Sequence, residues 1–419
     1  MKIVTAGLGL RAAHVLSILK EAMPEAELVG YCDPQPASVL EVEGATFDDD
    51  AARALIPDQV FPGVPDAPKV ATLRAGFTAC ADMRRITPRF DDVAGMLAAT
   101  NPDLFFVGSP NSFHLDHIKA GLSAGVRIFT EKPVVTTKQD TMELAALLAE
   151  HGTDQVMVGL VLRYSQHMID LRAVLDDLGP IVSMEANEHI APYHGAFFMR
   201  DWRRMVAWSG GFMLEKCCHD IDIYNMVTGS RPIKVASFGG RKSFVPDNAS
   251  SGNLENEIMH HKPSLWESVD DAFHSDGDII DHQTALLQYE TGASLAFHTN
   301  LNVPDEHRRF CVMGTHGMAE GDFVRGNLKA TARDGSVIAA HDYTQMNAAQ
   351  ASAHYGADHY MVNDIVAFLR GDTAELPVGV VDALEAGLVA MALDEARISG
   401  AMIDLTATWR EFDGYGLRT

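Results

Sequence analysis

Residues 3–12 read Ile-Val-Thr-Ala-Gly-Leu-Gly-Leu-Arg-Ala, a short apolar strand that leads directly into a G-x-G-x-x-A turn. In this pattern Gly7 permits a tight turn, Gly9 lets the backbone approach a pyrophosphate, and the small Ala12 allows close helix–strand packing. A helix is expected over residues 13–23, with its N-terminal N–H groups and dipole facing the phosphates. The stretch therefore predicts the start of a dinucleotide-binding βαβ unit.

An acidic residue follows at the spacing that this unit requires. The apolar stretch Leu28–Cys32 ends at Asp33, about twenty positions after the glycines. A carboxylate there accepts hydrogen bonds from the adenosine ribose hydroxyls and repels a 2′-phosphate. We therefore expect NAD as the cofactor in preference to NADP. The alternative, a strand, turn and helix without a ligand, does not explain the position of Asp33.

Composition limits the class of protein. The 419 residues suggest two domains, and 47% hydrophobic with 21% charged residues is ordinary for a globular enzyme. No apolar run reaches about 18 residues, so no membrane span is expected. A net charge of −24 argues against nucleic-acid binding. The first strand begins almost at Met1, which leaves no room for a signal peptide and favours the cytoplasm.

The pattern of elements predicts an α/β chain with two kinds of sheet. In the first half, strands at 101–109 and 127–130 alternate with helices at 93–99 and 115–124, as in a doubly wound parallel sheet. We expect this Rossmann domain to span residues 1–135. The Pro- and Asp-rich residues 44–86 are interpreted as an insertion in it.

The second half, residues 136–419, is expected to be an α+β domain with a large, mostly antiparallel open sheet. Few helices interrupt its strands, and residues 248–278 read as a long loop. Apolar residues at helical spacing predict two late core-facing helices, near 361–369 and 381–391. The predicted strands are residues 181–188, 234–239, 285–289, 294–301 and 309–314.

Two short motifs carry chemistry. Glu131-Lys132-Pro133 directly follows a predicted parallel strand, at the sheet edge where α/β proteins place ligands. An ammonium at Lys132 can hydrogen-bond a substrate hydroxyl and stabilise an alkoxide. Farther on, Glu215, His219 and Asp222 share one face of a predicted helix. The imidazole is suited to accept a hydroxyl proton, and the carboxylate of Glu215 is expected to orient it.

Taken together, the motifs resemble one family. They are Gly7–Ala12, Asp33, Ser109-Pro110-Asn111 with His114, Glu131-Lys132-Pro133, and the Gly210-Gly211 to Asp222 block. In this order they resemble the glucose–fructose oxidoreductase/inositol dehydrogenase (Gfo/Idh/MocA) family over nearly the whole chain. The resemblance implies an NAD-dependent oxidoreductase that acts on a secondary alcohol of a sugar, sugar derivative or cyclitol. It also implies that the open sheet builds a homodimer or homotetramer.

The resemblance further implies roles for single residues. Lys132 and His219 look like the catalytic lysine and acid/base, and Glu215 stands where the family usually has Asp. The expected cofactor contacts are Gly7, Gly9, Leu10, Arg11, Ala12, Asp33, Ser109, Pro110, Asn111, His114, Glu131 and Lys132. The expected substrate contacts, which include the Arg- and Trp-rich segment before the histidine block, are Arg163, Tyr164, His194, Arg200, Trp202, Arg203, Lys216 and Asp222. Arginine forks suit carboxylates or vicinal hydroxyls, and Trp can stack on a sugar face, although a solvated basic loop is the alternative for this segment.

Two other functions stay open at this point. A glycosidase with tightly bound NAD would use the same motifs for transient oxidation and elimination. A non-catalytic NAD-binding regulator is the second, against which the presence of both Lys132 and His219 argues. No metal is expected, because His260-His261 and His274 match no standard ligand spacing. The chain also has no G-x-S-x-G, which a hydrolase of the Ser-His-Asp type would carry.

Overall fold

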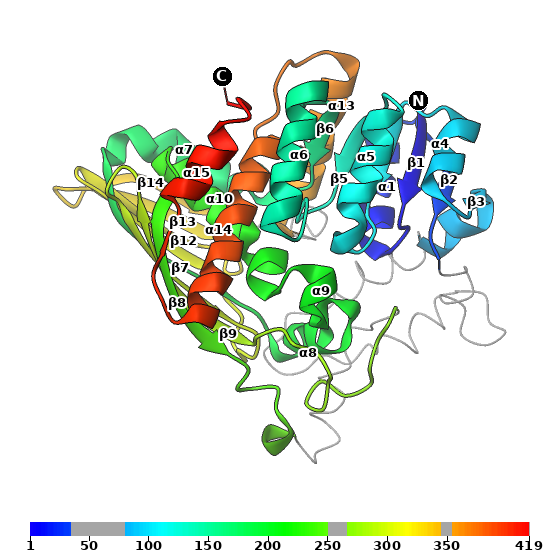
Figure 1. The fold of residues 1–419 in the computed structure, drawn as a ribbon. Coiled ribbons are helices and arrows are strands. Elements are labelled where there is room, and N and C mark those ends of the chain that lie inside the picture. Colours follow the sequence, from blue (N-terminus) through cyan, green and yellow to red (C-terminus); the bar gives the residue numbers. More distant parts are fainter. Residues whose placement is uncertain (35–79, 250–265, 345–353, 419) are drawn as a thin grey trace.

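A computed structural model describes residues 1–34, 80–249, 266–344 and 354–418. It contains the two predicted sheets, which lie in separate parts of the molecule (Figure 1). The first is a six-stranded parallel sheet with the order β3-β2-β1-β4-β5-β6. Its strands are β1 (Lys2–Ala6), β2 (Glu27–Cys32), β3 (Arg89–Phe90), β4 (Leu104–Val107), β5 (Arg127–Thr130) and β6 (Val156–Val158).

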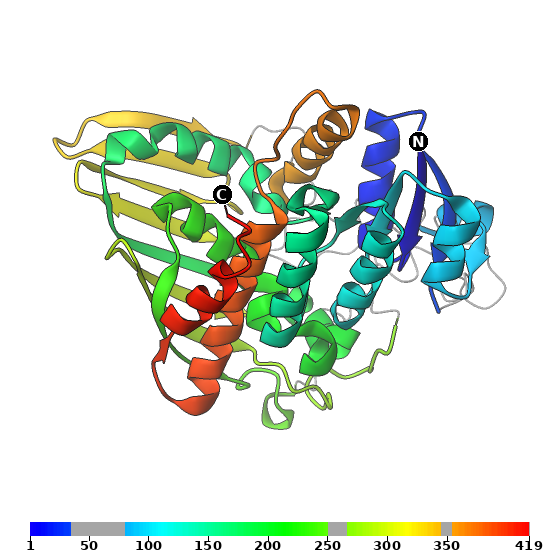
Figure 2. The same ribbon diagram turned by 45° about the horizontal axis from the view of Figure 1, so that its top comes forward.

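This strand order is that of a doubly wound dinucleotide-binding sheet, so the predicted Rossmann fold is confirmed. The order reverses between β1 and β4, and ligands of such sheets bind outside the carboxyl ends of the strands at this point. Helices cover the sheet on its two faces (Figure 2). They are α1 (Leu10–Ala22), α4 (Val93–Thr100), α5 (His114–Ser123) and α6 (Lys138–His151).

Two of these helices begin at residues that cap them. Asp92 accepts a hydrogen bond from Gly95 N at the start of α4, and Thr137 accepts one from Asp140 N at the start of α6. Such side chains satisfy N–H groups that the first turn leaves free. In contrast, α1 begins at Leu10, directly after Gly9, and no side chain in the described part of the chain caps it. Its first N–H groups are therefore available to a ligand.

The second sheet has nine strands in the order β14-β13-β12-β11-β7-β10-β9-β8-β15. Among the strand pairs of the described residues, only β7–β10 is parallel in this sheet, so the predicted mostly antiparallel sheet is confirmed. The strands are β7 (Ile181–His189), β8 (Pro232–Gly240), β9 (His282–Tyr289), β10 (Ser294–Asn300), β11 (Arg309–Gly314), β12 (Gly317–Asp322), β13 (Asn327–Ala332), β14 (Val337–Asp342) and β15 (Ile403–Asp404).

Helices pack on one face of this sheet. The long helices α7 (Gln166–Leu178), α10 (Phe212–Thr228) and α14 (Val380–Ser399) contact its strands on that side (Figures 1 and 2). Along β10, Leu295 and Phe297 are buried toward the helices, and His298 is exposed on the other side. The alternation is that of a sheet with one covered face.

A further helix of the second half lies beside the first domain. Helix α13 (Ala357–Arg370) packs against α1, the helix that follows the glycine turn. Helices α13 and α14 correspond to the two late helices predicted from apolar spacing. The packing of α13 on α1 brings residues from near position 358 to the nucleotide-binding turn.

Two expectations fall largely outside the described residues. Most of the predicted 44–86 insertion and the centre of the 248–278 loop lie outside the described residues; positions 80–86 are helical. Because β6 belongs to the parallel sheet, we propose that the first domain extends beyond position 135, to Val158. Among the described helices, none is both long and apolar enough to cross a membrane.

Candidate active site

The glycine turn offers an open space at the start of α1. Gly7 has φ +78°, and a Cβ there would lie 2.5 Å from Ser109 N, so only glycine fits. A Cβ on Gly9 would meet no atom within 4 Å. Ala12 is buried against the sheet, as the motif requires. The uncapped N–H groups of α1 and the space beside Gly9 thus fit a pyrophosphate.

Asp33 ends β2, as predicted, and is paired with an arginine that the sequence analysis missed. Its Oδ2 accepts hydrogen bonds from Leu8 N and from Arg84 NH2, both at 2.9 Å. Arg84 is buried and also donates through Nε to Leu8 O. Arg84 lies in the segment interpreted as an insertion, and no motif marked it. The ion pair lowers the negative charge that Asp33 presents to a ribose.

Lys132 follows β5 and reaches the second domain. Its Nζ donates a 2.6 Å hydrogen bond to the backbone carbonyl of Glu215, and it lies 3.6 Å from Glu215 Oε1. The peptide bond between Lys132 and Pro133 is cis. The two contacts with Glu215 fix the ammonium at the N-terminal turn of α10, the helix that carries the histidine block.

Glu215 is buried in that first turn, but its contacts differ from the prediction. Its oxygens accept hydrogen bonds from Asn111 Nδ2 at 2.6 Å and from Arg203 Nε at 2.7 Å. Although burial alone would raise the pKa of Glu215, Lys132 and Arg203 lower it below its usual value. The carboxylate faces two cations, Lys132 and Arg203, and the side-chain amide of Asn111. It has no hydrogen bond to His219. The expectation that Glu215 orients the imidazole is thus corrected: it holds Lys132 and Arg203.

His219 lies one turn farther along α10 and is 1% exposed. Neither ring nitrogen has a hydrogen-bond partner within the described part of the chain. Burial and the nearby Lys132 ammonium hold the pKa of His219 well below its usual value. The ring is therefore a neutral imidazole at neutral pH, the form that can accept a proton.

The other predicted cofactor residues join loops around this point. Both ring nitrogens of His114 lie beside backbone carbonyls, Nδ1 2.9 Å from Pro133 O and Nε2 2.8 Å from Ser109 O. Asn111, which follows Pro110 in a 3₁₀ turn, also donates to Ser209 O. The His114 contacts join two loops of the first domain, and the Asn111 contact joins that domain to the second. Glu131 accepts a 2.9 Å hydrogen bond from Arg11 Nε.

Some predicted substrate residues lie around Glu215 and His219. Arg203, which binds Glu215, also bonds Asp201 and lies 4.2 Å over the Trp202 ring. Lys216 pairs with Glu188 at 2.9 Å. Glu188 and Asp220 in turn hold the fully buried Arg308, at 2.8 and 2.6 Å. The side chains of Arg203 and Lys216 are thus each held in place by an ion pair with a carboxylate.

Others point into the protein. His194 packs its ring on Phe198 at 5.3 Å, and Arg200 is buried beside it in α8 (Pro192–Arg200). Tyr164 is also buried, and burial raises the pKa of its hydroxyl. The burial of Arg200 and Tyr164 indicates packing within the domain, whereas His194 is half-buried.

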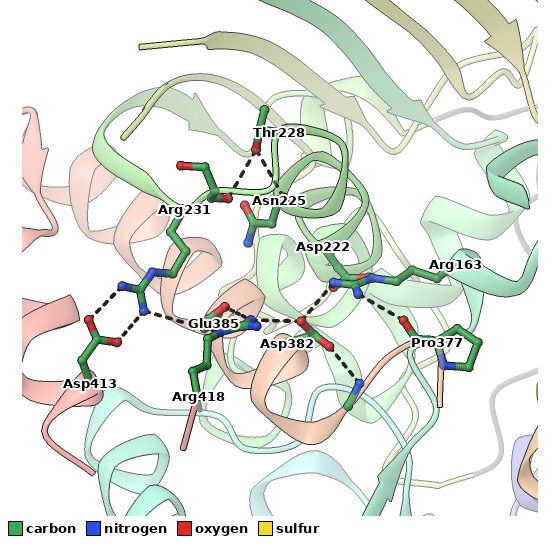
Figure 3. Close-up of polar contacts among 12 residues, drawn as sticks. Arg163, Asp222, Asn225, Thr228, Arg231, Pro377, Asp382, Glu385, Asp413 and Arg418 are labelled. Carbon is green, nitrogen blue, oxygen red and sulfur yellow. Dashed lines mark hydrogen bonds and ion pairs between the residues drawn. The ribbon is translucent and has the colours of Figure 1, made fainter. Parts of the chain in front are cut away.

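Arg163 and Asp222 belong to a network of charged side chains that joins α10 to α14 and the C-terminal residues (Figure 3). Arg163 Nε donates to Asp222 Oδ2 at 2.7 Å, and its NH2 lies 3.3 Å from Asp382. Burial raises the pKa of Asp222 to about 6, although Arg163 opposes this shift. The network continues through Asp382, Arg418, Glu385, Arg231 and Asp413. Asp222 lies on α10 as the spacing predicts, and its two carboxylate oxygens both accept hydrogen bonds from Arg163.

In the described ranges, no three His, Cys, Asp or Glu residues gather closely enough to hold a metal ion. His260 and His261 lie outside the described residues. His274 pairs with Asp271 on an exposed surface.

Comparisons with known proteins agree with this geometry. The model "Oxidoreductase family, NAD-binding Rossmann fold" matches residues 1–160, and "Oxidoreductase family, C-terminal alpha/beta domain", of the same Gfo/Idh/MocA group, matches 172–405. YteT of Bacillus subtilis is 26% identical over 275 residues, 56% of this chain and 64% of that protein. An inositol 2-dehydrogenase/D-chiro-inositol 3-dehydrogenase of Halalkalibacterium halodurans is 32% identical over 88 residues, 21% of this chain and 25% of its own length.

The chain thus spans less than two thirds of the length of either curated relative. A solved structure gives a fuller match. Scyllo-inositol dehydrogenase from Lactobacillus casei, with bound NAD(H) and scyllo-inositol, aligns with a TM-score of 0.65 at 19% identity. The alignment covers 97% of this chain and 99% of that one, so the two proteins share their whole fold.

Proposed function

The chain belongs to the Gfo/Idh/MocA oxidoreductase family, and from this membership we propose that it transfers a hydride between NAD and a secondary alcohol. The substrate class is a sugar, a sugar derivative or a cyclitol. One observation carries the proposal. The Lys132 ammonium, from the nucleotide-binding domain, is fixed on the helix whose next turn bears the buried, neutral His219.

The residues divide the chemistry as follows. His219 accepts the proton of the substrate hydroxyl, because burial keeps its imidazole uncharged. Lys132 stabilises the negative charge that develops on the same oxygen. Glu215 keeps the ammonium in place and balances its charge. Arg203 and Asn111 fix Glu215 in turn.

The nicotinamide cofactor fits the glycine turn described above. The N–H groups at the start of α1 would bind its pyrophosphate beside Gly9, and Asp33 would bind the adenosine ribose. When bound, the nicotinamide ring accepts or returns the hydride. NAD is proposed in preference to NADP because Asp33 ends β2. Arg84 reduces this preference by pairing with the same carboxylate.

A second copy of the chain is the proposed partner of the open sheet face. Phe238, Leu286 and Met402 are exposed there, and a groove of about 440 Å³ runs over β7, β8, β9 and β10. The face carries apolar side chains of neighbouring strands, which favour burial against a like surface. A Phe238→Lys variant should lower the mass measured by light scattering from a dimer or tetramer toward a monomer. A wild-type monomer would contradict this proposal.

A substrate panel tests the function directly. Sugars, sugar acids and cyclitols are mixed with the enzyme and NAD, and NADH formation is followed by absorbance. Turnover on at least one of them that disappears in a Lys132→Ala, His219→Ala double variant is the expected result. Release of free sugar from a glycoside without net NADH would instead assign the transient-oxidation mechanism. Saturable NAD binding with no turnover on any compound would indicate a regulator.

A further inference from the structure

A strained segment enters α13 next to His219. His354, Tyr355 and Gly356 all have left-handed backbone angles, with φ of +51°, +60° and +81°. A bulky residue in this region is an outlier, and such conformations persist where the surrounding structure fixes them and cluster at functional sites. The strained conformation of His354 therefore indicates that neighbouring residues hold it in place and that it has a role at this site.

A buried carboxylate holds it from the next turn. His354 Nδ1 lies 3.2 Å from Asp358 Oδ2, a hydrogen bond in which the imidazole N–H donates. Asp358 is 1% exposed and lies 2.7 Å from Arg11 NH2 and 3.3 Å from His14 Nε2. Although burial would raise the pKa of Asp358, Arg11 and His354 hold it well below its usual value. Asp358 is thus an ionised anchor that orients the His354 ring.

The anchored ring packs on the proposed base. The ring centroids of His354 and His219 are 5.6 Å apart, with the planes tilted by 51°. Since no described residue hydrogen-bonds either nitrogen of His219, this ring contact is a specific restraint on its imidazole. The other end of the chain of contacts is Arg11, which lies in the first turn of α1 and also binds Glu131.

We propose that His354 is a positioning residue: anchored by Asp358 and Arg11, it fixes the imidazole of His219 relative to the cofactor-binding turn. The inference rests on the proposed function. It assigns no contact with substrate to His354. The charged groups that face His219 are Lys132, Arg308 and Lys216, and those that face His354 are Asp358, Arg11 and Lys216.

His354→Asn is the sharpest variant, because Asn tolerates the left-handed conformation and removes only the ring. We expect kcat to fall about 10- to 100-fold through misplacement of His219, with an unchanged Kd for NAD. The acid limb of the kcat/KM profile should move to higher pH, since His354 is one of the groups that lower the pKa of His219. Asp358→Asn should also lower kcat, and the double variant should lose no more kcat than the larger single effect.

His167→Asn is the matched control. His167 is a buried histidine whose ring lies 6.3 Å from Tyr355, with no ring contact to His219 within the described residues. This variant disturbs the same segment and should keep both kcat and the acid limb. If His354→Asn fails to fold, Asp358→Asn decides with the same readouts.

The outcomes separate the two proposals. A wild-type enzyme without turnover overturns the proposed function, and the histidine ring resonances of His219 then still test the contact with His354 by NMR. An active wild type whose His354→Asn and Asp358→Asn variants keep kcat, the acid limb and the His219 resonances overturns the positioning role alone.

Discussion

The Lys132 ammonium donates to the backbone carbonyl of Glu215 at 2.6 Å, and this carbonyl lies one turn before His219 on the same helix. A backbone acceptor cannot be removed by substitution, so the position of the ammonium relative to α10 is built into the fold. The side chain of Glu215 adds a second, electrostatic restraint at 3.6 Å. The geometry of the two proposed catalytic groups thus depends on one short helical segment.

Removal of either group should stop chemistry but not cofactor binding. Lys132→Ala and His219→Ala are each expected to lower kcat by about two to four orders of magnitude, the usual contribution of a positioned proton-transfer or charge-stabilising group. Kd for NAD, measured by fluorescence titration, should stay near the wild-type value. Lys138→Ala is the control, because that lysine is half-exposed and lies away from Glu215. Near-wild-type turnover in both variants would refute the assignment.

Glu215→Gln should affect stability as well as rate. The substitution keeps the shape but removes the buried negative charge that pairs with Lys132 and Arg203, although Arg203 retains Asp201 as a partner. Breaking such a buried pair typically costs about 3–5 kcal/mol in the free energy of unfolding. Urea denaturation and kcat measure the two effects. Glu143→Gln, which removes an exposed pair with Lys119, should change stability by less than about 1 kcal/mol.

Cofactor choice should depend on the Asp33–Arg84 pair. Asp33→Ala removes the ribose acceptor and frees the guanidinium, so the ratio of kcat/KM for NAD over NADP should fall about tenfold, the equivalent of ~1.4 kcal/mol. Arg84→Met should raise the same ratio, because it uncovers the carboxylate charge. Arg85→Met serves as the control, since Arg85 pairs with the exposed Asp82. A wild-type preference for NADP would contradict the interpretation of Asp33.

Arg163 should prove structural. Arg163→Met leaves Asp222 buried without its partner and is expected to lower the free energy of unfolding by about 3–5 kcal/mol. The KM for substrate should change less than threefold, on the order of 0.6 kcal/mol. Arg325→Met, at an exposed pair with Asp305, is the comparison. A large rise in KM with unchanged urea denaturation would restore Arg163 to the substrate site.

Acid should destabilise the fold through its buried histidines. Burial lowers the pKa of His167 to about 4, and burial likewise lowers that of His354 to about 4. The unfolded chain binds protons on these rings below its ordinary histidine pKa of about 6.5, whereas the native state binds them only near pH 4. Stability should therefore fall as pH drops from 6.5 toward 4, by about 1.4 kcal/mol per unit for each histidine. His167→Asn should reduce this slope in urea denaturation, and an unchanged slope would contradict the assignment.

Local patterns predicted the elements that depend on local physics. The glycine turn, the strand Arg127–Thr130 and the strand Arg309–Gly314 carry strong apolar runs or fixed glycine geometry. The last strands of the large sheet were missed for the opposite reason. In β12 and β13 most buried positions are filled by small residues such as Ala319, Gly321 and Ala330, and Leu328 is a single large apolar side chain among them, so the alternation is weak.

From the sequence, only those site residues that share one helix face could be placed together. Spacing placed Glu215 and His219 on the same side of a helix, and this is what the structure has. Their partners come from other parts of the chain: Asn111 from the first domain and His354 from beyond position 350. Periodicity gives the direction of a side chain but not the neighbour it meets, so Asp358 and Arg84 carried no signal.

The pairs Lys132–Glu215, Asn111–Ser209 and Arg11–Asp358 each join the nucleotide-binding half to the other half. In a chimera of this chain and a distant homologue, the contacts between the two halves would be mismatched unless both members of each pair came from the same parent. Recombination with a crossover point chosen only to keep each sheet intact should yield hybrids that fold but whose catalytic groups are misplaced and inactive. Grafting a new specificity onto this scaffold therefore calls for exchanging loops within one half, never the halves themselves.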